Sequence, residues 1–315
     1  MIYRELAGLG KKRLQAAGLE DADTDALILF EHVTGIGRGR LLADGDREAS
    51  ERETDRYELL LEKRAAHIPT QYITGRADFM GLEFIVDRNV LIPRFDTEYL
   101  VEEMMRVVED GASVLDVCTG SGCILLSLMR YKNGIKGTGT DISRAALDIA
   151  QQNEEAIFFS TRAKSPRDKS LHNADGLSED VFRGMHISVD WIQSDMFEKV
   201  EGSFDYIVSN PPYIRSEVVD TLMPEVREHE PRIALDGDHD GLRYYRTIAK
   251  EAGKHLKRSG RIFLEIGYDQ GQAVTELLSE HGFTDVRVLK DYSHNDRVVT
   301  ARNAQDTQHL PKTYY

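Results

Sequence analysis

The motif in this sequence with the clearest chemical consequence is Asn210-Pro211-Pro212-Tyr213, which directly follows the apolar segment Phe204–Ser209. Two consecutive prolines fix φ and remove two backbone donors, so the loop keeps mainly hydrogen-bond acceptors. The side-chain oxygen of Asn210 and the carbonyl of Pro211 could bind both N–H groups of a planar –NH₂, and Tyr213 could stack on its plane. Because that nitrogen is a poor nucleophile, positioning and electrostatics would provide most of the acceleration. The alternative interpretation is a rigid structural turn.

A glycine-rich turn, Thr119-Gly120-Ser121-Gly122, follows the apolar segment Ser113–Val117. Its glycines permit close approach to a ligand, and the helix after it would present free N–H groups and a positive dipole end. A dinucleotide site would have a third glycine where this chain has Leu125. Asp116, at the strand end, suits a cationic amino-acid group better than a pyrophosphate. We therefore expect Asp116 and the turn residues Thr119, Gly120, Ser121 and Gly122 to bind S-adenosylmethionine.

Two further aspartates are expected to bind the same cofactor, whose product would be S-adenosylhomocysteine. Asp141 ends the segment 137–141, where a carboxylate can accept hydrogen bonds from both ribose hydroxyls. Alternatively, Asp141 could be the N-cap of a helix beginning near Ser143. Asp195 lies in Gln193–Phe197 and could accept from the adenine amine, or it could be a loop or capping aspartate.

Strand and helix patterns alternate from residue 95 onward, which predicts a parallel sheet covered by helices. In such sheets ligands bind beyond the carboxyl ends of the strands, which would place the Asn-Pro-Pro-Tyr loop beside the glycine turn. The last two strands are expected to form an antiparallel pair because only Lys290–Asp296 joins them. The predicted strands are Ser113–Val117, Lys136–Thr140, Ile187–Ile192, Asp205–Ser209, Arg261–Ile266, Asp285–Leu289 and Arg297–Thr300.

The remaining segments have simpler patterns. Residues 1–76 show apolar residues at helical spacing and predict a small helical bundle, with Asp23 and Ser50 as N-caps. That bundle could be a packing module or could recognise a partner. Residues 77–94 contain strand formers around Asp87-Arg88-Asn89, which predicts a β-hairpin linker. The polar residues 160–180 predict a loop insertion, and residues 303–315 a polar tail.

Composition narrows the classes of function. The 315 residues carry a net charge of −14, which disfavours a nucleic-acid binder because such proteins usually need a basic face. No segment approaches the roughly 18 apolar residues of a membrane span, and the N-terminus has no signal-peptide core, so a cytoplasmic location is expected. Cys118 and Cys123 lack zinc-site spacing and predict two buried, reduced thiols and no metal.

These motifs together resemble the PrmC/HemK family of release-factor glutamine methyltransferases. The combination of Leu-Ile-Pro-Arg at 91–94 with Asn-Pro-Pro-Tyr makes the resemblance specific, whereas before residue 70 it extends only to helical character. The matching segments are Gln71–Gly75, Val90–Glu98, Val114–Ile124, Gly139–Asp141, Ser194–Phe197, Asn210–Tyr213, Glu230-Pro231, Ala234–Gly237, Asp240–Leu242, Leu264–Gly267 and Asp296-Arg297.

The resemblance implies an α/β fold: a Rossmann-like, seven-stranded class I methyltransferase domain over residues 95–302, with the N-terminal helical domain docking the substrate. It implies that the glutamine of a Gly-Gly-Gln loop enters between Asn210 and Tyr213. The implied substrate entrance comprises Pro93, Arg94 and Thr97. Release factors would be the partners of a monomer that binds neither a stable nucleic acid nor a membrane.

The resemblance leaves the roles of two carboxylates undecided. Glu98 could lie near the ligands or be a solvated carboxylate at a helix start, and Glu265 could hydrogen-bond locally or be structural. Phe95 stands where the family usually has proline, and the stretch from Asn153 to Asp195 is longer than the family pattern. Three other functions remain as alternatives. An adenine exocyclic-amine methyltransferase would use the same loop but would have to flip the base. The others are a glutamine methyltransferase of a ribosomal protein and a non-catalytic binding module.

Overall fold

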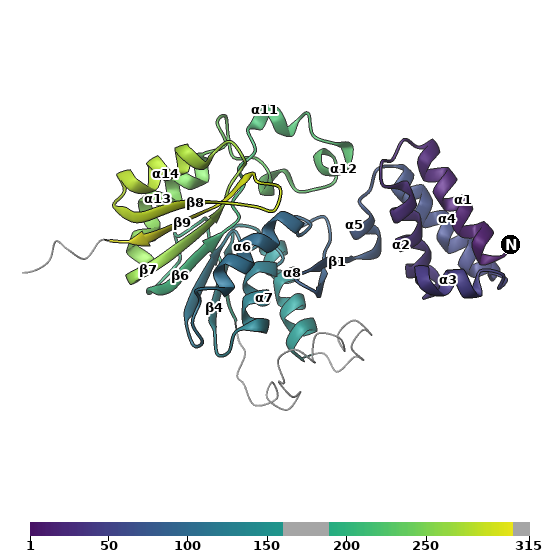
Figure 1. Cartoon of the computed structure of the whole chain (residues 1–315), viewed down its shortest axis with the longest axis horizontal. Coiled ribbons are helices and arrows are strands. Elements are labelled where there is room, and N and C mark those ends of the chain that lie inside the picture. Colours follow the sequence, from purple (N-terminus) through teal and green to yellow (C-terminus); the bar gives the residue numbers. More distant parts are fainter. Residues whose placement is uncertain (160–188, 305–315) are drawn as a thin grey trace, which may run out of the picture. The chain divides into compact units, whose positions relative to one another are not determined.

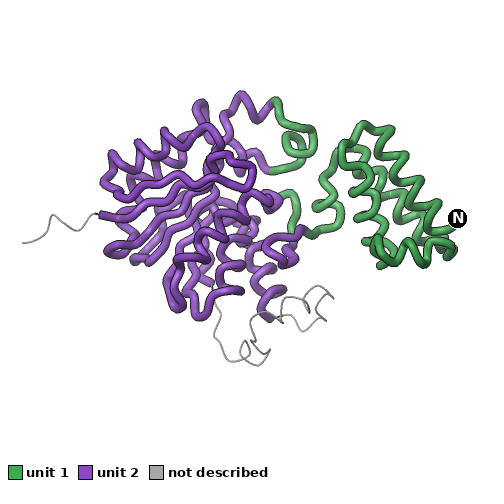
Figure 2. Tube along the Cα trace, in the orientation of Figure 1, with its two compact units in different colours: residues 1–76, 86–88, 221–230 green, residues 77–85, 89–220, 231–315 purple. Residues whose placement is uncertain are grey.

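The computed structural model describes residues 1–159 and 189–304 (Figure 1). The predicted insertion at 160–180 and residues 305–315 of the predicted tail lie outside the described residues. Contacts divide the chain into two compact units (Figure 2). Unit 1 comprises 1–76, 86–88 and 221–230, and unit 2 comprises 77–85, 89–220 and 231–315. Across the described residues, no helix has the length and apolar character required to span a bilayer.

Unit 1 is a bundle of short helices, as the helical spacing predicted. Its core includes Tyr3, Phe30 and Tyr57, whose rings meet edge to face at centroid distances of 5.3 and 5.8 Å. Ser50 caps its helix by accepting from Glu53 N at 3.3 Å, which confirms that prediction. Asp23 was predicted wrongly as a cap, because it lies inside the first turn of its helix. The helices are α1 Tyr3–Ala16, α2 Ala22–Thr34, α3 Arg38–Asp44, α4 Glu51–Ala65 and α5 Thr70–Thr74.

A buried ionic network joins the late segment 221–230 to the helices of unit 1. Glu225, in α12 (Pro224–Arg227), accepts from Arg64 Nη1 at 3.1 Å and lies 2.9 Å from His67 Nδ1. Arg64, only 7% exposed, also donates to Asp25 Oδ2 at 2.7 Å. Asp25 accepts a further bond from Thr70 Oγ1 at 2.7 Å. Each buried charge therefore has a partner, and removing one would leave the others uncompensated.

The β-hairpin lies earlier than the sequence pattern predicted. It consists of β1 (Arg76–Phe79) and β2 (Leu82–Ile85), and its turn is Met80-Gly81, with φ of 50° and 72°, rather than Asp87-Arg88-Asn89. Positive φ at both central residues is typical of a two-residue hairpin turn. The earlier position buries Phe79 and Phe84 against each other in the core of unit 2, at a ring distance of 6.0 Å. Packing therefore decided which apolar residues became strands.

Unit 2 contains a seven-stranded sheet in the order β5-β4-β3-β6-β7-β9-β8 (Figure 1). β9 runs antiparallel to β7 and β8 and the other neighbours are parallel, so both the α/β class and the antiparallel final pair are confirmed. The strands are β3 Ser113–Val117, β4 Lys136–Asp141, β5 Val189–Gln193, β6 Phe204–Ser209, β7 Leu256–Glu265, β8 Phe283–Lys290 and β9 Asp296–Asn303.

The two faces of the sheet are covered by different helices (Figure 1). Leu115 and Ile207 point into a core formed with α13 and α14, whereas Val114 and Val208 point into a core formed with α6 and α7. This alternation explains why β3 and β6 have apolar residues on both faces. The helices of unit 2 are α6 Phe95–Met105, α7 Cys123–Tyr131, α8 Arg144–Glu154, α11 Ser216–Val219, α13 Arg243–His255 and α14 Gly271–Glu280, with a π-helix at Glu155–Phe159 and a 3₁₀-helix at Arg232–Ala234.

The strand order reverses at β3, which pairs with β4 on one side and β6 on the other. Val117, near the end of β3, lies opposite Thr140 of β4 and Ser209 of β6. The loops that follow these three strands therefore leave the sheet at one edge. A reversal of strand order is the place where open α/β sheets form a ligand-binding crevice.

Candidate active site

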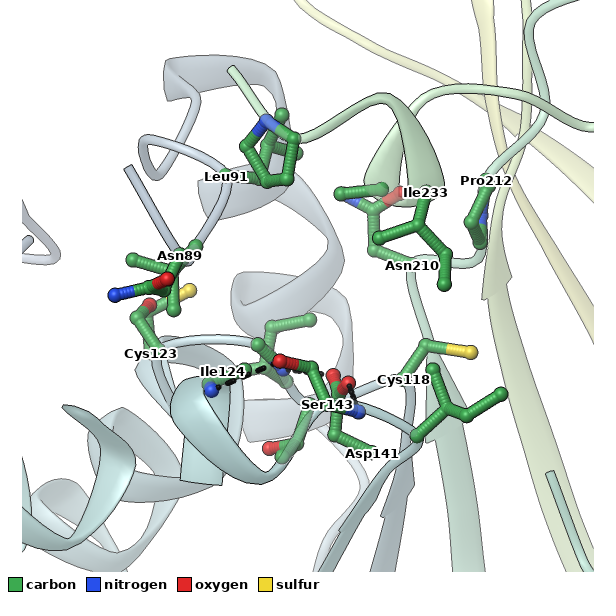
Figure 3. Close-up of a pocket in the computed structure, with 18 of the residues that line it drawn as sticks. Asn89, Leu91, Cys118, Cys123, Ile124, Asp141, Ser143, Asn210, Pro212 and Ile233 are labelled. Carbon is green, nitrogen blue, oxygen red and sulfur yellow. Dashed lines mark hydrogen bonds between the residues drawn. The ribbon is translucent and has the colours of Figure 1, made fainter. Parts of the chain in front are cut away.

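A cavity of about 930 Å³, measured to its solvent-open mouth, lies at this edge and is lined entirely by residues of unit 2. Figure 3 shows Asn210 and Pro212 on its wall, together with Asp141, Ser143 and Cys118. Among the predicted site residues, those that line the cavity are Pro93, Arg94, Thr97, Thr119, Gly120, Ser121, Asp141, Asp195, Asn210 and Pro212. The predicted site residues that are not among the lining residues are Asp116, Gly122, Pro211 and Tyr213.

The glycine turn between β3 and α7 uses its two glycines differently. Both have positive φ, 56° for Gly120 and 77° for Gly122, which any other residue would adopt only with strain. A Cβ on Gly120 would meet no atom within 4 Å, so this backbone borders open space in the cavity. A Cβ on Gly122 would come within 2.9 Å of Trp191. Gly120 thus leaves room for a ligand, and Gly122 permits close packing inside the protein.

Asp116 supports the turn from behind. Its side chain is fully buried, and Oδ2 accepts from Thr119 Oγ1 at 2.7 Å. Burial raises the pKa of this carboxyl to about 7, and the hydrogen bond from Thr119 opposes that rise. Direct contact between Asp116 and a ligand stays a prediction, while its support of Thr119 is a contact that the sequence did not indicate.

Asp141 links the end of β4 to the glycine turn. Its Oδ2 accepts from Gly120 N at 3.0 Å and its Oδ1 from Ser143 N at 2.8 Å. Burial raises the pKa of Asp141, while these backbone hydrogen bonds lower it. The cap of α8 is Ser143, which accepts from Ala146 N at 3.2 Å, so the capping interpretation of Asp141 was wrong. Each carboxylate oxygen keeps a second lone pair, which suits a pair of hydroxyl donors.

Asp195 lies on the cavity wall beyond β5, and its side chain is exposed. The adjacent Ser194 closes this loop by accepting from Lys199 N at 3.0 Å. Within residues 1–159 and 189–304, no protein donor binds the carboxylate of Asp195, so it is available to a ligand at this corner.

The Asn-Pro-Pro-Tyr loop after β6 is held at both of its ends. Asn210 donates from Nδ2 to Thr97 Oγ1 at 3.1 Å, and its Oδ1 is then the part of the amide left to accept. Tyr213 donates its hydroxyl to Glu265 Oε1 at 3.4 Å, and its backbone carbonyl accepts from Gln270 Nε2 at 3.0 Å. The loop therefore presents an amide oxygen whose direction is set by a neighbouring helix.

Some features of the cavity were not expected from the sequence. Cys118 lines it and is only partly buried, which corrects the prediction of two buried thiols, although both cysteines are free. Its φ of 61° is unusual for a non-glycine residue. Ile233 and Tyr244 also line the cavity, and no periodic pattern indicated either of them. Across the described residues no metal-binding cluster of His, Cys, Asp or Glu occurs.

Glu98 lies in the first turn of α6, as the helix-start interpretation expected, but it is half-buried and does not line the cavity. Its carboxylate accepts from Met80 N at 2.6 Å and so holds the turn of the β1–β2 hairpin. Glu98 is therefore a structural residue that fixes α6 to the hairpin. It directly follows Thr97 in the sequence.

Comparisons with known proteins cover nearly the whole chain. Residues 5–75 match the family model of the PrmC N-terminal domain, and residues 94–211 match a methyltransferase domain. A release factor glutamine methyltransferase of Caulobacter vibrioides is 40% identical, covering 92% of each chain, and that of Agrobacterium fabrum is 37% identical, covering 93% of this chain and 94% of the relative. The solved structure of a release factor-specific protein-(glutamine-N5) methyltransferase from Alicyclobacillus acidocaldarius is 30% identical, with a TM-score of 0.37, and covers 70% of this chain and 99% of that one.

Proposed function

The chain belongs to the release factor glutamine methyltransferases, and we propose that it methylates the side-chain amide nitrogen of the glutamine in a release factor's Gly-Gly-Gln loop. The observation that carries the proposal for the site is the amide of Asn210. Its nitrogen is bound to Thr97, which leaves the oxygen as an acceptor in the cavity that the glycine turn and Asp141 also line. A planar –NH₂ substrate requires acceptors of this kind.

The cofactor of this proposal is S-adenosylmethionine, which when bound supplies an electrophilic methyl group on a sulfonium. The residues fit it: the cavity lies where the strand order reverses, and Gly120 leaves its backbone open to a ligand. Asp141 would accept from the ribose hydroxyls and Asp195 from the adenine amine. Asp116 would supply negative charge behind the turn for the methionine end.

The residues of the loop would act mainly by positioning. Asn210 Oδ1 and the Pro211 carbonyl would hold the two N–H groups of the glutamine amide, and Tyr213 would limit rotation of its plane. An amide nitrogen aligned in this way needs no strong base, because an N-alkylated amide cation loses its proton readily. Holding the reacting groups in alignment before the reaction can raise the rate by several orders of magnitude. Pro93, Arg94 and Thr97 would form the entrance to this site.

Unit 1 would recognise the release factor, and translation termination places the proposed reaction in the cytoplasm. In this proposal the protein acts as a monomer. Neither a nucleic acid nor a membrane is needed.

Labelled cofactor tests the proposal directly. The protein is incubated separately with a release factor, a ribosomal protein and DNA, and the labelled residue is mapped by mass spectrometry. We expect label only in the release factor, on the glutamine of Gly-Gly-Gln, and none in a release factor with alanine at that position. Label on adenine or on a ribosomal protein would establish one of the alternative functions instead.

A further inference from the structure

A second pocket adjoins the cavity within unit 2 and is not used in the proposed function. It has a volume of about 720 Å³, measured to its solvent-open mouth. Ile233 and Tyr244 line both the pocket and the cavity, so the pocket continues from the cavity wall. Its other lining residues are polar or charged, namely Ser216, Arg232, Asp236, Asp238 and Arg243. A ligand held in the cavity therefore has a polar surface directly beside it.

This pocket is built onto the Asn-Pro-Pro-Tyr loop. Ile214, the next residue after that loop, donates its N–H to the Leu235 carbonyl at 2.9 Å and accepts from Gly237 N at 2.8 Å. A Cβ on Gly237 would come within 2.8 Å of Tyr213 Cα, so the two backbones are in contact. Residues 235–237 are therefore fixed against the loop that carries the acceptor amide, and the pocket keeps its place relative to that amide.

Part of the pocket lining is a closed hydrogen-bonded network. Arg232 donates from Nε to Asp236 at 3.1 Å and from Nη2 to the Ser216 carbonyl at 3.3 Å. Its guanidinium also pairs with Asp220. Asp236 accepts a further bond from the Ser216 hydroxyl at 2.6 Å. Because these groups bind one another, we expect them to hold the shape of the pocket rather than to bind a ligand.

Arg243, in contrast, forms no ion pair with a carboxylate of the described residues. It is exposed, and its guanidinium carbon lies 5.4 Å from the centre of the Tyr244 ring. It is also the first residue of α13, where the helix dipole disfavours a cation. Neither an ion pair nor the stability of the helix therefore explains a cation at this position.

Asp238 supplies an acceptor to the same pocket. Its Oδ1 accepts from His239 N at 2.7 Å, whereas its Oδ2 has no protein donor in the part of the chain that the structure describes. The pocket thus offers a donor on Arg243 and an acceptor on Asp238. A peptide unit carries one acceptor and one donor, so this pair is complementary to a peptide main chain. An anion would fit less well, because Asp236 and Asp238 would repel it.

We propose that this pocket binds the main chain of the substrate beside the target glutamine, with Arg243 donating to a peptide carbonyl and Asp238 accepting from a peptide N–H. The inference rests on the proposed function, in which the glutamine side chain reaches Asn210. A side chain held there leaves its own main chain at the cavity wall, and the pocket is the adjoining polar surface. Ile233, which is 52% exposed, would be covered by the same peptide.

Contacts of this kind change binding more than turnover. They are made to the main chain and not to the reacting atoms, so they stabilise the bound substrate and the transition state equally. Arg243→Ala should therefore raise KM for the release factor about tenfold, as expected for one hydrogen bond from a charged group at an exposed site. It should leave kcat and cofactor affinity near those of the wild type. The matched control is Arg246→Ala, which should keep the wild-type KM, because Arg246 lies on the same helix, pairs with Asp240 and does not line the pocket.

Asp238→Asn distinguishes a peptide from an anion. The oxygen of the asparagine can still accept from His239 N, so its NH₂ would replace the acceptor Oδ2. Loss of that acceptor should raise KM by roughly three- to tenfold if a peptide N–H binds there. An anionic ligand predicts the opposite, since removing a negative charge would lower KM. A lower KM in this variant, or an unchanged KM in Arg243→Ala, would overturn the inference.

Binding without turnover separates this inference from the proposed function. A peptide that contains Gly-Gly-Gln with residues on both sides is titrated onto the wild-type protein, and the side-chain ¹⁵Nε–¹H signal of Arg243 is followed. That signal, identified by its absence in Arg243→Ala, should shift with the peptide and not with inorganic phosphate. A shift with phosphate alone, or none with the peptide, would refute the role of the pocket even if release factors are methylated. A shift with the peptide but no methylation would refute only the proposed function.

Discussion

Replacing Asp141 by alanine can distinguish two roles of its carboxylate, namely binding the cofactor and holding the glycine turn. The wild-type carboxylate accepts from Gly120 N and Ser143 N, and in our proposal it also accepts from two ribose hydroxyls. Hydrogen bonds to a charged group contribute about 1.5–3 kcal/mol each, and water replaces part of that when the carboxylate is removed. We therefore expect the cofactor to bind about 2–3 kcal/mol more weakly, a loss in affinity of roughly 30- to 150-fold.

The same variant should change stability much less than affinity. Losing two backbone hydrogen bonds lowers the free energy of unfolding by about 1 kcal/mol each. Burial of the Asp141 carboxylate, which raises its pKa, is itself unfavourable, so its removal offsets part of this loss. Isothermal titration calorimetry gives the dissociation constant, and urea unfolding gives the free energy of unfolding.

Ser50→Ala is the control for a loss of stability alone, because it removes only a helix cap in unit 1, worth about 1 kcal/mol. It should leave cofactor affinity unchanged. Asp141→Asn, which keeps the shape but replaces one acceptor with a donor, should fall between the wild type and Asp141→Ala. A dissociation constant within twofold of wild type for Asp141→Ala would refute the ribose contact and leave Asp141 only a role in holding the turn.

Three other changes have distinct expected results. Asn210→Ala should reduce kcat/KM by about 10²- to 10³-fold with cofactor affinity nearly intact, and full activity would exclude the acceptor role. Gly120→Ala forces a side chain into left-handed backbone at φ 56° and into the cavity, so calorimetry should show weaker cofactor binding and urea unfolding a loss of about 1–2 kcal/mol. Arg64→Ala leaves Asp25 and Glu225 without their buried cation and should destabilise by about 3–5 kcal/mol in urea unfolding. Arg40→Ala, which breaks only an exposed pair with Asp44, should cost under about 0.5 kcal/mol, and equal losses for the two arginine variants would contradict the argument.

Features that depend on near neighbours in the chain could be read from the sequence. The central strands β3 and β6 have apolar residues on both faces because both faces are buried, and their positions were predicted to within a residue. The capping box at Ser50 and the positive φ of Gly120 and Gly122 are likewise local. The Asn-Pro-Pro-Tyr motif predicted an acceptor-rich loop, and this too is a local property, because each proline lacks a backbone donor whatever its surroundings.

Errors arose where two local signals competed and packing chose between them. Asp87-Arg88-Asn89 has turn residues, but the hairpin forms around Met80-Gly81 because that register buries Phe79 and Phe84. Local turn and strand propensities alone could not decide between these two positions of the turn.

The sequence by itself therefore determined the α/β class, the places of most strands and the chemical type of the two loops that define the site. Only the tertiary structure decided which side chains meet there. Thr97 and Asn210 are 113 residues apart, so no spacing along the chain could pair them. Their meeting depends on strand order and register, which are set by packing across the whole sheet, and it is this meeting that gives the Asn210 amide its direction.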